Sequence, residues 1–248
     1  MKLKGVKKVT PQISHQYQCI FIHIPKAAGT TIETSGIFYD QRQATGKNVA
    51  GHLNAIGFKE KFPNEFENYF KFTFVRNPFD RLVSAFYYFN KGGSNNDYDK
   101  AVFEKHFAPY KDNFRGFCLD WLSEDNIQKV VHLKPQIDFI HNENGENMVD
   151  FIGKVESFSQ DFELVCKKLG FPHFQKVSKK RRSKHKDYST YYTSEMLSRV
   201  ASVYEEDLSV FNYKYDNSKL RVINKEFENF GLSLKENINK MKSFVKKM

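Results

Sequence analysis

Two short segments of this 248-residue chain combine cationic and hydroxyl side chains as an anion site requires. The first segment spans residues 25–31 and holds, in order, Lys26, Ala28, Gly29, Thr30 and Thr31. A glycine lets the backbone approach a ligand closely, and the first N–H groups of a following helix are unpaired and partly positive. The segment therefore predicts a cradle for a phosphate-like anion, with an ordinary strand-to-helix turn and a surface lysine as the alternative. It is not a Walker A motif, because Lys26 precedes the only glycine of the segment.

The second segment joins Arg76 to Ser84, which lies two helical turns further along the chain. Arg76 ends a run of aromatic and β-branched residues, and open parallel sheets bind their ligands where such strands end. An arginine can hold a phosphate through two parallel hydrogen bonds. We therefore predict a second phosphate site beside the first. The alternative is a local ion pair of Arg76 or Arg81 with Asp80, which for Arg81 is the preferred interpretation.

The elements that must position these segments alternate between strands and helices. Apolar or β-branched runs predict strands at residues 19–24, 48–52, 69–76 and 147–155. Helical spacing predicts helices at residues 53–61, 80–89, 158–169 and 193–210. This alternation is typical of an α/β fold in three layers, with a central parallel sheet flanked by helices. Residues 92–99 are rich in glycine and asparagine and predict a mobile loop.

The composition limits the partners and the compartment. Lys plus Arg number 39 against 29 Asp plus Glu, so the net charge of +10 favours anionic partners such as nucleotides, nucleic acid, acidic glycans or a membrane surface. The three cysteines form no CxxC pair, which excludes a zinc ribbon and favours a reducing compartment. Because no secretory signal pattern and no apolar run of membrane-spanning length is found, we expect a soluble, cytoplasmic protein. A protein of the Golgi lumen, trimmed of an N-terminal anchor, is the alternative.

Both segments resemble the motifs of a known family. Residues 21–31 resemble the 5′-phosphosulfate loop of the sulfotransferases that use 3′-phosphoadenosine-5′-phosphosulfate (PAPS), and residues 74–84 resemble their 3′-phosphate site. The branch is that of the carbohydrate sulfotransferases, with the heparan 2-O- and chondroitin/dermatan enzymes and many bacterial relatives. Two weaker likenesses follow in the family's order, at residues 153–162 and 204–213. The resemblance covers roughly residues 17–215 and implies a P-loop-like version of the three-layer fold.

The resemblance also implies roles for the matching residues. The contacts it implies for the 5′-phosphate are Lys26, Ala28, Gly29, Thr30 and Thr31. Lys26 would also reach the oxygen that bridges this phosphate to the sulfuryl group. Arg76 and Ser84 would hold the 3′-phosphate.

A histidine would supply the base. Gly51-His52 resembles the Gly-His pair of the heparan 2-O-sulfotransferase branch, whose histidine is the catalytic base. An unperturbed imidazole titrates at about 6.5, so it can accept a hydroxyl proton near neutral pH. The alternative for His52 is a structural histidine at a strand end, and His23 is expected to be structural.

The implied reaction is in-line transfer of a sulfuryl group from PAPS to a hydroxyl of a carbohydrate acceptor, with 3′,5′-adenosine bisphosphate (PAP) as product. Lys26 and His52 would be the catalytic residues, and no metal is expected. An anionic polysaccharide is one candidate acceptor. We expect neither nucleic acid nor a membrane segment as a partner, and a monomer or weak homodimer. Two alternatives remain open: a P-loop-like nucleotide kinase, and a non-catalytic basic module that binds acidic glycan or nucleic acid.

One basic segment has several interpretations. Residues 176–186 contain seven Lys or Arg residues, and their plainest interpretation is a solvated stretch. The resemblance implies a loop that closes on the nucleotide, with Arg182, Ser183 and Lys184 as contacts, although Arg181 stands where the family has asparagine. Binding of an anionic glycan is the other candidate role. We expect the segment to become ordered when PAP binds.

The chain is expected to divide into a sulfotransferase domain at 1–215 and a helical extension at 216–248. Apolar residues of the extension recur at alternating spacings of four and three residues, which predicts an amphipathic helix. We expect this helix to pack on the domain, with a dimer seam or a membrane contact as alternatives.

Overall fold

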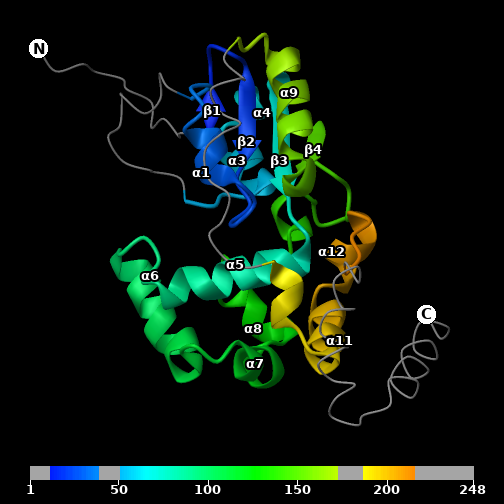
Figure 1. Cartoon of the computed structure of the whole chain (residues 1–248). Helices are drawn as coiled ribbons and strands as arrows, with labels where there is room; N and C mark the ends of the chain where they lie inside the picture. The colour runs from blue at the N-terminus through cyan, green and yellow to red at the C-terminus, as the bar shows by residue number, and fades with distance from the viewer. Residues whose placement is uncertain (1–11, 39–50, 173–186, 216–248) are drawn as a thin grey trace, which may run out of the picture.

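The computed structural model describes residues 12–38, 51–172 and 187–215 (Figure 1). The predicted nucleotide contacts Arg182, Ser183 and Lys184 and the predicted extension at 216–248 lie outside the described residues. So does most of the strand predicted at 48–52.

A four-stranded sheet forms one part of the fold (Figure 1). Its strands lie side by side in the order β1 (Ile13–Ser14), β2 (Cys19–Ile22), β3 (Phe70–Val75) and β4 (Phe151–Lys154). The predicted parallel arrangement is confirmed for β2, β3 and β4, but the short edge strand β1 runs antiparallel to β2 and was not predicted. Of the strand predicted at 48–52, only Gly51 and His52 are described. They form no strand, so this part of the prediction was wrong.

Helices cover both faces of the sheet, as the sequence predicted. On one face, Phe21 of β2 lies in a buried cluster with residues of α1 (Gly29–Glu33) and α9 (Phe158–Leu169). On the other face, Ile22 of β2 lies in a cluster with residues of α3 (Ala55–Lys61) and α4 (Pro63–Asn68). Successive strand residues point to opposite faces, so β2 is apolar throughout because both of its faces are buried.

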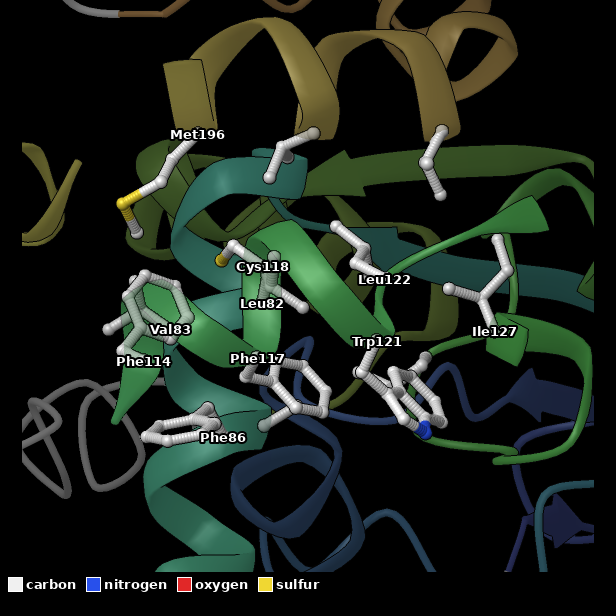
Figure 2. Close-up of a cluster of buried hydrophobic side chains, with 14 of the residues drawn as sticks. Leu82, Val83, Phe86, Phe114, Phe117, Cys118, Trp121, Leu122, Ile127 and Met196 are labelled. Carbon is white, nitrogen blue, oxygen red and sulfur yellow. The ribbon is translucent and has the colours of Figure 1, made fainter. Parts of the chain in front are cut away.

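The helix α5 (Pro78–Asn90) leads from the end of β3 into a second, helical part (Figure 1). Its buried side chains, among them Leu82 and Phe86, pack against Phe117, Trp121 and Met196 (Figure 2). The α-helices of this part are α6 (Asp97–Val102), α7 (Phe114–Gly116), α8 (Glu124–Gln128) and α11 (Ser194–Val203), followed by α12 (Glu205–Val210). Short π- or 3₁₀-helical turns are found at Phe103–Phe107, Ala108–Tyr110, Phe117–Trp121, Ile137–Phe139, Val155–Ser157 and Tyr188–Tyr191.

The helix ends follow local sequence signals. The side chain of Asn77 accepts a hydrogen bond from the N–H of Phe79 and caps α5, whose first residue is a proline. Helix α9 matches the prediction and ends at Gly170, which has a φ of 64°. The prediction of a single helix at 193–210 is wrong in one respect, because the structure has two helices there, α11 and α12, separated at Tyr204.

Two further features bear on the predictions. The segment predicted as a loop at 92–99 already includes the start of α6. Its last residue, Asp99, is buried and accepts hydrogen bonds from Tyr88, Ser94 and Asn96. The three cysteines are buried and form no disulfide. Within the described residues, no helix has the length and apolar character needed to cross a membrane.

Candidate anion-binding and catalytic site

The two predicted phosphate segments meet at one edge of the sheet. Strands β2 and β3 are parallel and paired in register, with Ile22 opposite Thr73, so the chain leaves both strands in the same direction. The Nη1 atom of Arg76 donates a hydrogen bond to the carbonyl oxygen of Lys26 at 3.2 Å. The sheet therefore brings these two cationic residues together, at the position where parallel sheets bind ligands.

The loop between β2 and α1 has an unusual backbone. Lys26 and Ala28 have φ values of 66° and 65°, a conformation that costs a non-glycine residue roughly 1–3 kcal/mol. Within the described residues, the N–H groups of Ala28, Gly29 and Thr30 make no hydrogen bond, whereas those of the next two residues bond to the carbonyl of Ala28. The loop thus presents three backbone donors beside Lys26, which suits the binding of an anion.

His23 explains why position 29 is a glycine. A Cβ atom added at Gly29 would lie 1.8 Å from Nε2 of His23, so the imidazole fills the space under the loop. The ring is held by a contact of 2.8 Å between its Nδ1 and the buried carboxylate of Glu33. Gln12 donates a hydrogen bond to the same carboxylate oxygen and another to the carbonyl of Gly51. His23 is therefore a structural residue, as predicted, and it supports the loop.

Lys26 lies against an aromatic ring. Its Nζ is 3.9 Å from the centroid of Tyr88. Burial and the charge of Arg76 lower the pKa of Lys26 to about 8, although Asp99 acts in the opposite direction. The ammonium group is thus mostly protonated at neutral pH and can pair with an anion.

His52 has the tautomer and charge of a potential base. Its Nδ1 lies 3.3 Å from the carbonyl oxygen of His23, which can only accept, so Nδ1 carries the proton and Nε2 keeps its lone pair. Burial, and next the neighbouring His23, lower the pKa of His52 to about 4. The His52 ring also packs against His132 at 5.2 Å between centroids. His52 is thus neutral at physiological pH and could accept a proton at Nε2.

His132 is a further member of this histidine cluster. It is buried, and burial, together with His52 and Lys26, lowers its pKa to about 2. Its Nδ1 has no hydrogen-bond partner among the described residues. His132 therefore stays neutral and acts as a packing surface for the ring of His52.

Arg76 is held by the side chains of Asp80 and Gln136, in addition to its hydrogen bond to the carbonyl of Lys26. Its guanidinium forms an ion pair of 2.7 Å with Asp80, the alternative that the sequence left open. Its backbone N–H and carbonyl are both bonded to the side-chain amide of Gln136. Ser84 is half-buried and lies one helical turn beyond Asp80, on the same face of α5. The ion pair does not remove Arg76 from a binding role, because it orients the guanidinium beside the loop.

The preferred interpretation of Arg81 was wrong. Its side chain is 2% exposed and donates hydrogen bonds to the carbonyls of Pro25 at 3.0 Å and Lys134 at 2.8 Å. Burial lowers its pKa. Arg81 thus has a structural role, because it links Pro25, the first residue of the anion loop, to Lys134. The periodicity of α5 could have indicated this, because position 81 falls on its buried face.

Several residues of the site were missed by the sequence analysis. They are Tyr88, Asp99, His132, Gln136 and Asp207. Asp207 accepts hydrogen bonds from the backbone N–H groups of Gln136 and Ile137, 71 and 70 residues away in the chain. The only sequence signal for this contact was the likeness of residues 204–213 to a family segment, which gave no partner.

Comparison with known proteins identifies the family. The model of the sulfotransferase family matches residues 12–214, a range that contains every part of the described site. The chain belongs to the sulfotransferase family and is an enzyme of that class.

The curated relatives are distant. Carbohydrate sulfotransferase 11 of Rattus norvegicus is 23% identical over 238 residues, which cover 83% of this chain and 67% of that protein, and the Mus musculus protein of the same name gives the same values. Carbohydrate sulfotransferase 10 of Xenopus laevis is 22% identical over 247 residues, covering 82% of this chain and 66% of that protein. No solved structure gives a significant match to the chain.

The packing of His23 under Gly29 leads to a first prediction. Gly29→Ala forces the imidazole out of its place, and overpacking of this kind typically costs about 1–3 kcal/mol in stability. The loss should appear as a lower midpoint of urea unfolding. In the double variant Gly29→Ala/His23→Ala the added methyl group has room, so its effect on stability should be much smaller than in the wild-type background. Equal effects of Gly29→Ala in both backgrounds would contradict this description of the loop.

Proposed function

We propose that this enzyme transfers a sulfuryl group from PAPS to a hydroxyl group of a carbohydrate. The observation that carries the proposal is the pairing of Lys26 and Arg76 at the ends of adjacent parallel strands, within the range of the family match. The names of the distant relatives support a carbohydrate acceptor. The net charge of +10 supports an anionic polysaccharide as the acceptor class.

The residues of the site fit the donor. PAPS carries one phosphate on each side of its ribose, and the site offers two cationic residues, joined by the hydrogen bond from the Arg76 guanidinium to the backbone carbonyl of Lys26. Lys26 and the unpaired N–H groups of Ala28 to Thr30 would hold the 5′-phosphate, with the hydroxyl groups of Thr30 and Thr31 as further donors. Arg76 and Ser84 would hold the 3′-phosphate. Arg182, Ser183 and Lys184 remain predicted nucleotide contacts.

The chain's own groups would supply charge and a proton acceptor. When bound, the donor supplies a sulfuryl group attached to a phosphate leaving group. Lys26, protonated at neutral pH, would stabilise negative charge on the oxygen between these two groups. His52 would accept the proton of the acceptor hydroxyl at Nε2, because its Nδ1 is already bound to the carbonyl of His23. Fixed charges and positioning would then supply most of the rate enhancement, as in phosphoryl transfer.

The nucleotide specificity tests the proposal directly. PAP should raise the thermal unfolding midpoint more than ATP with magnesium or a short oligonucleotide does, which separates the transferase from a kinase and from a nucleic-acid-binding module. Arg76→Ala should weaken PAP binding about tenfold or more in calorimetry, since a hydrogen bond to a charged group is worth roughly 1.5–3 kcal/mol. Arg115→Ala is the matched control, because Arg115 is exposed and pairs only with Glu195 in the described residues. Unchanged PAP affinity in Arg76→Ala would remove Arg76 from the site.

The role of His52 can be tested separately. His52→Ala should lower turnover about a hundredfold or more while PAP affinity stays near wild type, because general-base catalysis typically contributes this much. The exposed His15 provides the control variant His15→Ala. Turnover is measured with labelled donor and an acceptor identified by screening. Since the pKa of His52 is about 4 in the free protein, wild-type kcat/KM, which reports the free enzyme, should show no histidine-like rise between pH 6 and 8. A variant that keeps most of its turnover would place the base elsewhere.

The pKa of Lys26 predicts how PAP binding depends on pH. Lys26 loses its charge as the pH rises through about 8 in the free protein, whereas both phosphates of PAP are already fully ionised there. PAP affinity should therefore fall between pH 7.5 and 9.5, by at most about tenfold per pH unit. Lys26→Arg should make the affinity nearly constant over this range, since arginine stays protonated. A wild-type affinity that does not change would show that Lys26 does not pair with the phosphate.

A further inference from the structure

The ammonium group of Lys26 has a defined resting place on α5. Its Nζ lies 3.9 Å from the ring centroid of Tyr88, a distance at which a cation is attracted to the face of an aromatic ring. Tyr88 lies one helical turn beyond Ser84 and two beyond Asp80, on the face of α5 that also holds the guanidinium of Arg76. One face of one helix therefore contacts both cations of the site.

The ring of Tyr88 is itself fixed at its hydroxyl end. The phenol donates a hydrogen bond of 2.6 Å to Oδ2 of Asp99, and Oγ of Ser94 lies 2.7 Å from the same hydroxyl. The N–H of Ser94 also donates to Oδ2 of Asp99. A Cβ atom added at Gly93 would lie 2.7 Å from Oδ2, so the turn closes tightly on the carboxylate. Residues 92–99, which the sequence predicts to form a mobile loop, thus surround the hydroxyl of Tyr88 with hydrogen-bond partners.

Charge favours the same arrangement. Asp99 is 3% exposed and places a carboxylate at the far end of the ring on which Lys26 lies. It acts on Lys26 in the opposite direction to the burial of the lysine and the positive charge of Arg76. The positive charge of Arg76 disfavours the ammonium group of Lys26 at this place. The ring of Tyr88 and the carboxylate of Asp99 favour it.

The ring of Tyr88 also contacts the histidine cluster. It stacks on His132 at 5.2 Å between centroids and an interplanar angle of 22°, and His132 packs in turn against His52. Tyr88 therefore contacts Lys26, which is predicted to bind the donor, and is connected through His132 to His52, which is predicted to act as base.

We propose that Tyr88, fixed by Asp99, is a positioning residue that holds the ammonium group of Lys26 in place for the incoming anion. The effect of this positioning on catalysis rests on the proposed function, whereas the contact between Lys26 and Tyr88 is independent of it. The ring pre-orders a long, flexible side chain, so donor binding does not have to order it.

The test measures the position of Lys26 directly by NMR, without any nucleotide. Protons that lie over the face of an aromatic ring shift upfield, so the ε-methylene signal of Lys26, assigned with Lys26→Arg, should lie upfield of the other lysine signals. Tyr88→Phe keeps the ring and should keep most of this shift, whereas Tyr88→Leu should abolish it. Tyr87→Leu is the matched control, because the neighbouring Tyr87 packs on Tyr191. An unshifted Lys26 signal in the wild-type protein overturns the proposal whether or not any variant folds.

PAP binding then tests the functional consequence. Tyr88→Leu should weaken PAP binding about two- to tenfold, the cost of ordering one long side chain, while Tyr87→Leu should not. Asp99→Asn removes the charge behind the ring, so the fall of PAP affinity with rising pH should begin at lower pH, and the exposed Asp97→Asn should leave it unchanged. If PAP binds equally well to Tyr88→Leu, the positioning role is wrong. If PAP does not bind even to the wild-type protein, the proposed function is wrong. The NMR test of the position of Lys26 is independent of that outcome.

Discussion

The site depends on the parallel pairing of β2 with β3. This pairing directs the loop after β2 and the residue after β3 to one edge of the sheet, where the guanidinium of Arg76 reaches the carbonyl of Lys26. The charge of Arg76 disfavours the protonated form of Lys26, so the site requires groups that hold each cation. Asp80 pairs with Arg76, and the ring of Tyr88 carries Lys26. The geometry of an anion site is therefore present in the protein alone, and its excess of positive charge is what an anionic ligand would neutralise.

A buried polar network holds the backbone at the end of β3, from which Arg76 projects. Gln136 bonds both backbone groups of Arg76 through its side chain, and Asp207 accepts the backbone N–H of Gln136. Arg81 joins the loop at Pro25 to Lys134, close to Gln136 in the chain. Groups of this kind are costly to bury, and removal of one partner leaves the other without compensation. The segment at 204–213 thus has a structural function, because it fixes the strand end from which Arg76 projects.

The sequence predicted the parts of the fold whose cause is local. Strand β2 is a continuous apolar run, and β3 is rich in aromatic and β-branched residues. Helices α5 and α9 have caps and periodicity in their own residues, so all four elements could be recognised without their neighbours. The short edge strand β1 has two residues and no such pattern. The predicted strand end at Gly51 and His52 failed because His52 is positioned by one hydrogen bond to His23 rather than by a strand ladder.

The site was predictable to the extent that its residues lie in the two phosphate motifs. Tyr88 contacts Lys26 and Gln136 contacts Arg76, and each contact joins residues about sixty apart in the chain. Neither the residue type nor the spacing of Tyr88 or Gln136 indicates its partner. Asp99 was hidden for a different reason. Its surroundings of glycine, serine and asparagine are typical of a solvated loop, and only the structure shows that they converge on one carboxylate.

The arrangement of charge separates two tasks that conflict in one site. An anion requires cations, but a histidine base must remain unprotonated and still attract a proton. Burial is the main cause of the lowered pKa of His52, and the nearby His23 and Arg81 lower it further, while Glu33 acts in the opposite direction. The ring of His132, which burial keeps neutral, and the ring of Tyr88 lie in contact between His52 and Lys26 without adding charge. A negative charge bound at the loop would act on His52 in the same direction as Glu33, raising its pKa and making its Nε2 a better proton acceptor. If His52 is the base, as we propose, it would then accept a proton best when the sulfuryl donor is in place, which is the state in which a proton has to leave the acceptor.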